Sequence, residues 1–468
     1  MAIDKLSEDV LLEIFDAYRQ LYESDPSYEY IWNSGDGWFK LTHVCRSWRR
    51  LVHLSPSRLH VHVLFTPCRS TTTTMLGNLP SFPILVEFRR QQWTKRELNL
   101  ALAIEHRARV RGIFLRPRSY VNTTKTFKML SRPFPELESL EIRSHHNYDL
   151  VTLPNPFILG SPSRLRRLKL RNVEPRCLSP LLSTVTGLVE LALTLKVSLD
   201  TLPDESLIAN LHRLSCLRRL ELRLMYSSHQ YVNMISDSPR PPASTRDIVP
   251  LPNLIRLVLS GHRIYLETLM VVLATPSLQY LNAELIDATH TFPIPHLCRL
   301  IRDTDHQFRL VRLDFSDFQL RLTAETHSES VHAQPFRISI PEPISLEEIG
   351  KRLAGPLATV EELDIRWTIT GEHFGVQWRQ FFNHLRQVKV LQVPWQVALD
   401  VARSFQQNGQ ETDMDLLPDL EQINMGMAHW HPPPRGPSSK DHVDIPDAFE
   451  PLIAARKRAG RPITLSLI

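Results

Sequence analysis

The hexapeptide LRRLKL at residues 165–170 returns almost unchanged as LRRLEL at residues 217–222, with apolar residues at its first, fourth and sixth positions. Related hexapeptides are VRGIFL (110–115), LESLEI (137–142), LVELAL (188–193), LIRLVL (254–259), LQYLNA (278–283), LVRLDF (310–315), VEELDI (360–365), VKVLQV (388–393) and LEQINM (420–425). Eight of the ten intervals between successive starts are 23 to 32 residues long, which leaves room for one strand and one helix. So many returns of one pattern indicate an internal structural repeat.

Segments with the spacing of an amphipathic helix lie between these hexapeptides. They are LSPLLSTV (178–185), ESLIANLHRL (205–214), YLETLMVVLA (265–274), SLEEIGKRLA (345–354), VQWRQFFNHL (376–385) and VALDVARSF (397–405). Their apolar residues recur every three or four positions, as in a helix that is buried along one face. Neither such a helix nor the short strand beside it can bury its apolar side alone, so neighbouring units stack. The sequence therefore predicts an α/β solenoid with parallel strands on its concave face.

This organisation resembles the leucine-rich repeat over residues 110–425. The resemblance implies an irregular horseshoe, because one expected feature is missing. His145, Val173, Lys196 and His262 stand where the family has Asn or Cys, three residues after the last apolar position. The backbone groups that such a side chain supports must then find other partners. The alternative is an ordinary α/β domain whose strands are rich in leucine.

Longer intervals between the hexapeptides predict insertions. Residues 226–250 and 322–344 are expected to be surface loops of the solenoid. Residues 61–109 are expected to connect to it or to form its first elements. Residues 426–468 are expected to hold a Pro-rich loop, then a helix and a strand that cap the solenoid, because an exposed last repeat would leave apolar surface in water.

Residues 1–60 have a pattern typical of a small helical module. The segment LSEDVLLEIF (6–15) predicts a first helix that Ser7 caps. The segment FKLTHVCRSWRRLVHL (39–54) predicts a second helix with Arg46, Arg49 and Arg50 on its solvent side. The apolar positions of the two helices are Leu6, Val10, Leu11, Ile14, Phe15, Leu41, Val44, Cys45, Trp48 and Leu51. So small a module has a weak core, and its apolar faces gain most by packing against another surface.

These two segments, followed by SPSRL (55–59), resemble the F-box, since Cys45 and Trp48 have the spacing of that family. Ser7 replaces the usual proline, and residues 19–38 make an insertion between the helices. The resemblance implies that the ten apolar residues above bind a Skp-type adaptor, and through it a cullin. The chain would then be the substrate-recognition subunit of a Skp-cullin-F-box ubiquitin ligase, with Cys45 as a small apolar filler and Trp48 as a packing anchor. The alternative is that these helices only cap the solenoid.

We count positions from the first residue of each hexapeptide, so that position seven is the residue directly after it. The side chains at positions three, five and seven are expected to point away from the core, onto the concave face. They predict a basic stripe that would bind an acidic or phosphorylated target, formed by Arg143, Arg167, Lys169, Arg171, Arg219, Arg223 and Arg256. The later strands are more acidic there, with Glu284, Arg312, Asp314, Glu362, Asp364 and Arg366. The alternative is a solvated face with weak ion pairs. Nucleic acid is not the expected partner, because no aromatic stacking platform accompanies the charges.

The sequence offers no signature of catalysis. It contains no GxSxG, GxGxxG, Walker or HExxH motif, so we expect neither an enzyme nor a cofactor. The pairs His60 with His62 and His429 with His431 lack a third ligand nearby, and no metal site is predicted. The alternative function is a non-catalytic leucine-rich-repeat scaffold that does not act through a ligase.

Cysteine usage and the N-terminus predict the compartment. The five cysteines are far apart, which fits buried thiols in a reducing environment better than disulfides. No apolar run is long enough to cross a membrane, and the first residues are acidic where a signal peptide is basic. We therefore expect an intracellular protein of the cytoplasm or nucleus.

Overall fold

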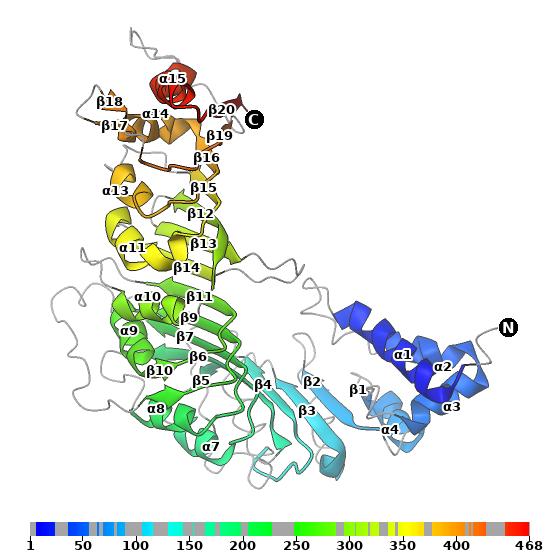
Figure 1. Cartoon of the computed structure of the whole chain (residues 1–468). Coiled ribbons are helices and arrows are strands. Elements are labelled where there is room, and N and C mark those ends of the chain that lie inside the picture. Colours follow the sequence, from blue (N-terminus) through cyan, green and yellow to red (C-terminus); the bar gives the residue numbers. More distant parts are fainter. Residues whose placement is uncertain are drawn as a thin grey trace, which may run out of the picture. The chain divides into compact units, whose positions relative to one another are not determined.

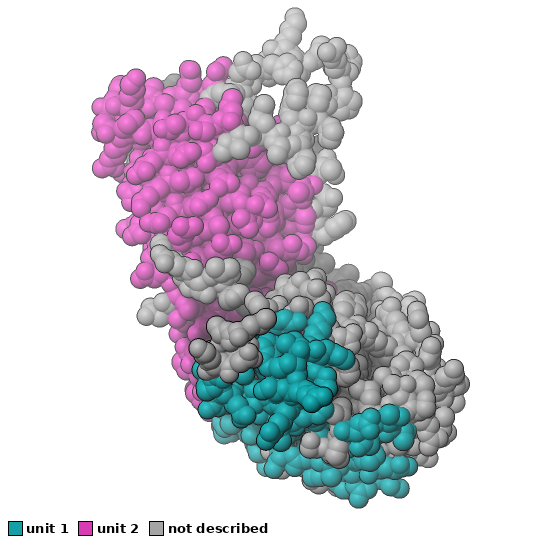
Figure 2. Space-filling model, turned by 90° about the vertical axis from the view of Figure 1, so that its right-hand side faces the viewer, with its two compact units in different colours: residues 1–196, 209–217 teal, residues 197–208, 218–468 magenta. Residues whose placement is uncertain are grey.

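The structure is a computed structural model of the chain. It describes residues 6–23, 36–55, 63–64, 69–78, 82–88, 105–115, 130–143, 153, 164–173, 178–197, 205–226, 248–286, 294–304, 306–316, 319–326, 336–341, 345–368, 377–407, 411–412, 415–426 and 445–467. These residues fall into two compact units, which Figure 2 colours separately. Unit 1 comprises residues 1–196 and 209–217, and unit 2 comprises residues 197–208 and 218–468.

The fold is mixed α/β with a large, mostly parallel sheet (Figure 1). Its helices are α1 (Glu8–Glu23), α2 (Asp36–Val44), α3 (Arg46–Leu54), α4 (Arg69–Asn78), α7 (Leu178–Thr184), α8 (Glu205–His212), α9 (Arg263–Val272), α10 (Pro295–Arg302), α11 (Leu346–Arg352), α12 (Ala354–Leu357), α13 (Trp378–Phe382), α14 (Trp395–Ser404) and α15 (Glu450–Arg458), with 3₁₀ turns η4 (Arg107–Arg109) and η8 (Ile445–Phe449). Its strands are β1 (Val63–Leu64), β2 (Ile84–Phe88), β3 (Val110–Leu115), β4 (Ser139–Arg143), β5 (Arg167–Val173), β6 (Glu190–Val197), β7 (Arg219–Tyr226), β9 (Arg256–Gly261), β11 (Tyr280–Leu285), β12 (Phe308–Ser316), β13 (Gln319–Thr326), β14 (Phe336–Pro341), β15 (Glu362–Trp367), β16 (Val390–Pro394), β19 (Gln422–Gly426) and β20 (Thr464–Leu467). Two further pairs are β8 (Val249–Pro250) with β10 (Leu273–Ala274) and β17 (Gln406–Gln407) with β18 (Glu411–Thr412).

Every repeat hexapeptide overlaps a strand, and every quoted helical segment overlaps a helix, so these secondary-structure predictions are confirmed. In unit 1 the strands follow the order β1-β2-β3-β4-β5-β6. In unit 2 the order is β7-β9-β11-β14-β13-β12-β15-β16-β19-β20. Helices α9 to α14 lie along one side of the unit-2 sheet (Figure 1).

The three apolar positions of the hexapeptide form the core on this helix side. In β9 and the turn before it, Leu254, Leu257 and Leu259 are each 0% exposed. The equivalent residues of the other ten copies are at most 8% exposed. Residues four and six share one face of the strand because side chains alternate, while the first residue ends the preceding turn. The apolar side chains of each repeat therefore contact both the helix of that repeat and the neighbouring repeats.

A tight turn brings the chain into most strands. The amide of the first apolar residue donates to the carbonyl three residues earlier, as from Leu254 to Leu251 at 3.1 Å and from Leu278 to Thr275 at 3.2 Å. Pro252 and Pro276 stand directly after the acceptor in these turns, where their fixed φ favours the turn. In these repeats the proline therefore helps to set where the strand begins.

A ladder of shared carbonyls then connects successive repeats. The carbonyl of the second hexapeptide residue accepts two amides of the next repeat, those of its second and third residues. The Glu138 carbonyl accepts from Arg166 and Arg167 at 2.8 and 3.0 Å, and the Glu361 carbonyl accepts from Lys389 and Val390 at 2.8 and 3.1 Å. Similar paired bonds reach the carbonyls of Arg166, Arg218, Ile255 and Lys389. Main-chain bonds therefore connect the repeats at the strand starts.

The prediction of a surface loop at residues 322–344 is wrong. Residues 319–326 form β13 and residues 336–341 form β14, and both are paired within the sheet. Strand β13 runs antiparallel to β12 and β14, so these two strands interrupt the parallel order between β11 and β12. Their apolar residues alternate into the core, which includes Leu320, Leu322, Ile338 and Ile340. The polar letters between them led sequence reasoning to expect a loop.

Other boundaries differ from the prediction in smaller ways. Helix α1 continues to Glu23, so it takes in the start of the insertion predicted at residues 19–38. The loop predicted at residues 226–250 ends in β8, and residues 227–247 lie outside the described residues. The C-terminal helix and strand are present as α15 and β20, and β20 extends the sheet beside β19. The Pro-rich stretch before them also lies outside the described residues.

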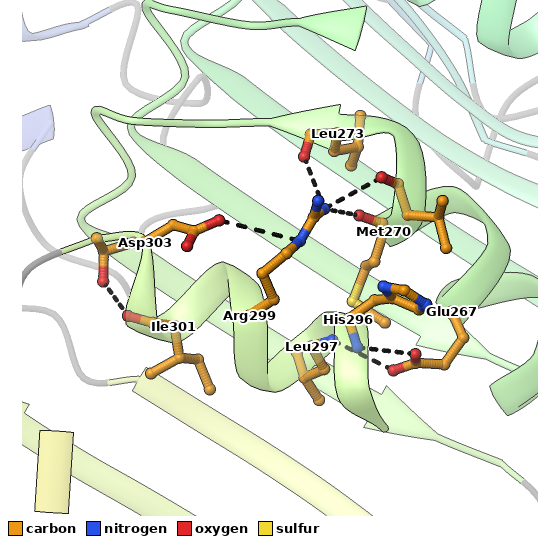
Figure 3. A network of polar contacts seen from close by, with 10 residues as sticks. Glu267, Met270, Leu273, His296, Leu297, Arg299, Ile301 and Asp303 are labelled. Atoms are coloured by element: carbon orange, nitrogen blue, oxygen red, sulfur yellow. Dashed lines mark hydrogen bonds and ion pairs between the residues drawn. The ribbon is translucent and has the colours of Figure 1, made fainter. Parts of the chain in front are cut away.

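Adjacent helices α9 and α10 satisfy each other's end groups (Figure 3). Glu267 of α9 accepts hydrogen bonds from the backbone amides of His296 and Leu297, at the start of α10, at 3.0 and 3.2 Å. In return, the guanidinium of Arg299 on α10 donates to backbone carbonyls at the end of α9, those of Met270, Val271 and Leu273. Burial raises the pKa of Glu267, and the two amide bonds oppose this rise. The hydrogen bonds of Glu267 and Arg299 therefore hold α9 and α10 together in the helix layer.

Helix α15 is fastened to the preceding turn by a buried arginine. Arg456 is 0% exposed and donates to the carbonyls of Leu416, Leu417 and Pro418 at 2.8 to 2.9 Å. Burying a guanidinium is costly unless its donors are satisfied, and three carbonyls supply acceptors here. The last helix is therefore fastened to the turn that precedes β19.

Leu257→Ala is expected to lower the free energy of unfolding by about 2–5 kcal/mol, because it leaves a cavity among fully buried neighbours. Arg219→Ala on the adjacent strand is the control, since an exposed side chain of this kind contributes about 0.5 kcal/mol or less. Urea denaturation followed by circular dichroism measures both. Equal stability of Leu257→Ala and the parent chain would contradict the packing described here.

Candidate functional site

Helix α1 has two apolar faces in different environments. Leu11, Leu12 and Phe15 are 6%, 5% and 1% exposed and form the core of the helical module. Val10 and Ile14 are each 45% exposed, on successive turns of the opposite face. Ser7 caps the helix as predicted, because its hydroxyl oxygen accepts from the amide of Val10 at 3.4 Å. The inner face holds the module together, and the outer face leaves apolar surface in contact with solvent.

The prediction of one continuous second helix is wrong, because the chain breaks at Cys45. This residue is extended, with φ −157° and ψ 172°, and separates α2 from α3. Its sulfur accepts a hydrogen bond from the amide of Trp48 at 3.5 Å, so it serves as the N-cap of α3. Cys45 is exposed, which also corrects its prediction as an apolar filler.

The rest of α2 and α3 divides between core and surface. Leu41 and Leu51 are buried, whereas Val44 is 60% exposed. The half-buried ring of Trp48 lies 4.7 Å from the ring of Phe15, which fits its predicted role as a packing anchor. Arg46, Arg49 and Arg50 are exposed, as predicted.

The helical module also contacts the first strands of unit 1. The imidazole of His53 on α3 meets the buried ring of Phe82 edge-on at 5.3 Å, and Arg109 donates two hydrogen bonds to the Phe82 carbonyl. Burial, and to a smaller extent Arg49, lowers the pKa of His53 and so favours its neutral form. One side of the module is therefore used for internal packing.

The ten residues predicted to bind an adaptor thus fall into two groups. Those that face solvent form what we call the outer apolar row, Leu6, Val10, Ile14 and Val44. Leu11, Phe15, Leu41 and Leu51 are core residues, Trp48 is half-buried, and Cys45 caps a helix. Among these ten residues, the outer apolar row provides the aliphatic side chains that a partner can contact without unfolding the module.

The basic residues predicted on the strands occur in both units, so each unit is described separately. In unit 1, Arg143 pairs with Glu141 at 2.7 Å and Lys169 pairs with Glu190 at 2.8 Å. Arg167 and Arg171 are exposed, and neither has a carboxylate partner among the described residues. Only part of the predicted positive charge is therefore unneutralised.

In unit 2, two of the three predicted arginines already have partners. Arg223 pairs with Glu221 at 2.6 Å. The guanidinium of Arg256 lies over the ring of Tyr280, 4.1 Å from its centre. Arg219 is exposed in the same register row as Arg256 and Tyr280. An aromatic ring thus accompanies these charges, which the sequence reading missed.

Further along the polar face of unit 2, a buried carboxylate organises two arginines. Asp364 on β15 accepts from Nε of Arg312 on β12 at 2.7 Å and from Nε of Arg366 at 3.1 Å. The Asp364 side chain is only 7% exposed, so these bonds replace most of its hydration. The hydrogen bond to Asp364 is the main cause of the raised pKa of Arg312. Because Asp314 lies 3.9 Å from Arg366, the four charges cancel.

Sequence reasoning missed two arginines on this face because it placed them in or beside a loop. Arg321 on β13 is in register with Asp314, and Arg337 on β14 is in register with Thr323. Both side chains are exposed. The alternation in RLTAET (321–326) and FRISIP (336–341) was the available signal. The later strands are therefore less acidic than predicted.

The remaining predicted features concern metals, thiols and membranes. Within the described residues, no three His, Cys, Asp or Glu side chains lie close enough to hold a metal ion, and the two histidine pairs noted in the sequence fall outside those residues.

Cys216 is exposed, whereas burial raises the pKa of Cys298 to about 12. Buried thiols were thus predicted correctly only for Cys298 among the described cysteines. Among the described helices, none has the length and apolar character needed to cross a membrane.

Comparison of the chain with protein-family models and with curated proteins found no match.

Asp364→Asn is expected to lower the free energy of unfolding by about 1–2 kcal/mol, because Arg312 and Arg366 lose a buried charged acceptor. Asp400→Asn is the matched control. Asp400 pairs with Arg403 at 3.7 Å on the surface, with both side chains well exposed, so its loss changes stability little. Chemical denaturation compares the two variants, and equal effects would contradict the account of Asp364.

Proposed function

We propose that the chain is the target-recognition subunit of a Skp-cullin-F-box ubiquitin ligase. The helical module binds a Skp-type adaptor, and the strands of the repeat region bind a target protein. In this proposal the chain contributes two binding surfaces and performs no catalysis itself. The repeats form an irregular leucine-rich-repeat solenoid.

The outer apolar row is the observation that carries the proposal. Val10 and Ile14 lie on a helix whose opposite face is fully used in the core, so their exposure is not needed for folding. Exposed aliphatic side chains one turn apart on a helix are typical of a surface that docks on an apolar groove. The motif resemblance at residues 6–15 and 41–52 supports a Skp-type adaptor as that partner.

The second half of the proposal is supported by two basic side chains of β5, Arg167 and Arg171, which have no carboxylate partner among the described residues. Arg167 and Arg171 project from one strand with Lys169 between them, on the face opposite the buried Leu168 and Leu170. A guanidinium without a carboxylate partner can form bidentate hydrogen bonds with an anionic side chain. We therefore infer that the target segment bound in unit 1 is acidic.

Val10→Asp combined with Ile14→Asp is expected to weaken binding of the full-length chain to a purified Skp-type adaptor at least about tenfold. The two charges would face an apolar partner surface and lose their hydration. Isothermal titration calorimetry measures the change, and thermal melting verifies that the module is folded.

Val271→Asp is the matched control, because Val271 is 40% exposed on a helix of unit 2 and outside the helical module. It should leave adaptor binding unchanged. If the parent chain does not bind the adaptor, the ligase proposal fails and the alternative of a non-ligase scaffold is favoured.

Reversal of Arg167, Lys169 and Arg171 to Glu is expected to remove acidic proteins from the set that co-purifies with the full-length chain, while the adaptor is retained. Quantitative mass spectrometry compares the two preparations. The control reverses three exposed basic residues near the end of α15, Lys457, Arg458 and Arg461. Equal losses in both variants would mean that total charge, rather than this strand, governs capture.

A further inference from the structure

Arginine is the basic residue of the central part of the chain. Of the 55 lysines and arginines, 44 are arginine and 11 are lysine. Between Lys196 and Lys351 the sequence holds 14 arginines and no lysine. We call residues 197–350 the lysine-free stretch. Basic residues are common in this stretch, but its side chains carry no primary amine.

Some of these arginines make contacts that suit a guanidinium. Arg299 donates from one nitrogen atom to three backbone carbonyls. Arg312 donates from Nε to Asp364 at 2.7 Å, and the guanidinium of Arg256 lies over the ring of Tyr280. A lysine has no planar fork for such contacts, so the folded structure explains arginine at these positions.

Other arginines of the stretch make no such contacts. Their side chains are exposed and form no hydrogen bond or ion pair among the described residues: Arg213, Arg218, Arg219, Arg302 and Arg309. A lysine in the same places would keep the positive charge at the surface. The contacts of the folded chain therefore give no reason for arginine at these positions. What remains is the reactivity that separates a guanidinium from an amine.

We propose that the lysine-free stretch keeps the chain from accepting ubiquitin while it presents a target, an inference that rests on the proposed function. In ubiquitin transfer, the ε-amine of a lysine attacks the carbonyl carbon of a ubiquitin thioester. A C–N bond forms, the C–S bond breaks, the thiol leaves and a proton of the amine passes to water. A guanidinium stays protonated, with its electron pairs delocalised, and does not take this step.

Proximity to the conjugating enzyme is what makes the stretch matter. A receptor lies beside that enzyme for as long as the ligase is assembled, so its own lysines compete with those of the target at high effective concentration. The first lysine after the stretch is Lys351 on α11, which is exposed and has no ion pair among the described residues. Transfer to the chain itself is thus directed to residues outside the stretch, such as Lys351.

The test adds amines to the stretch in the full-length chain. Arg218→Lys, Arg302→Lys and Arg309→Lys are combined, because these exposed side chains are not among the residues proposed to bind the adaptor or the target. The variant is assembled with purified adaptor, cullin complex, conjugating enzyme and ubiquitin, and mass spectrometry locates ubiquitin on the chain. We expect ubiquitin at the three new lysines and self-modification at least about threefold faster than in the parent chain.

The matched control combines Arg218→Gln, Arg302→Gln and Arg309→Gln. It removes the same guanidinium groups without adding an amine, so self-modification should proceed at the rate of the parent chain. Thermal melting and calorimetric titration with the adaptor verify that both variants fold and bind.

Two outcomes would overturn the inference. One is the absence of ubiquitin from the three new lysines, whether or not Lys351 is modified, since amines in the stretch would then be harmless. The other is an equal rise in self-modification of the glutamine variant. Either outcome with normal adaptor binding would reject this inference and leave the ligase proposal standing. A parent chain that does not bind the adaptor would overturn both.

Discussion

The backbone carbonyl that two amides of the next repeat share, at the second position of hexapeptides such as LESLEI and VEELDI, is the contact on which the rest of the fold depends. Where it accepts the second and third amides of the following repeat, it sets the position at which the next strand begins. Buried apolar residues are then in register from strand to strand, as Leu140 with Leu168 and Leu257 with Leu281.

Because backbone groups form the ladder, the outward side chains are free to differ between repeats. In unit 2, one register row runs from Arg223 through Ser260, Glu284, Ser339 and Arg321. The exposed members of this row, Arg223, Glu284 and Arg321, are therefore available for recognition. The same separation holds in α1, where the inner face provides stability and the outer apolar row is available to a partner.

The fold was predictable where one residue pattern had one physical meaning. Leucines at positions one, four and six predicted strands, and the structure has strands there. The pattern failed at residues 322–326 and 336–341, because polar residues such as Thr323 and Ser339 made alternating strands look like a loop. It also failed at Cys45, where spacing suited one helix but the extended backbone made two. Ion pairs such as Arg312 with Asp364 join residues far apart in sequence, so no local spacing reveals them.

The central claim is that an exposed face of the helical module, and not the repeat region, contacts a Skp-type adaptor. Hydrogen–deuterium exchange of the full-length chain, with and without excess purified adaptor, tests it most directly. The account predicts slower exchange in peptides covering α1 and the α2–α3 segment, with no change in the strands of unit 2. Protection confined to the strands, or no protection anywhere, would contradict it.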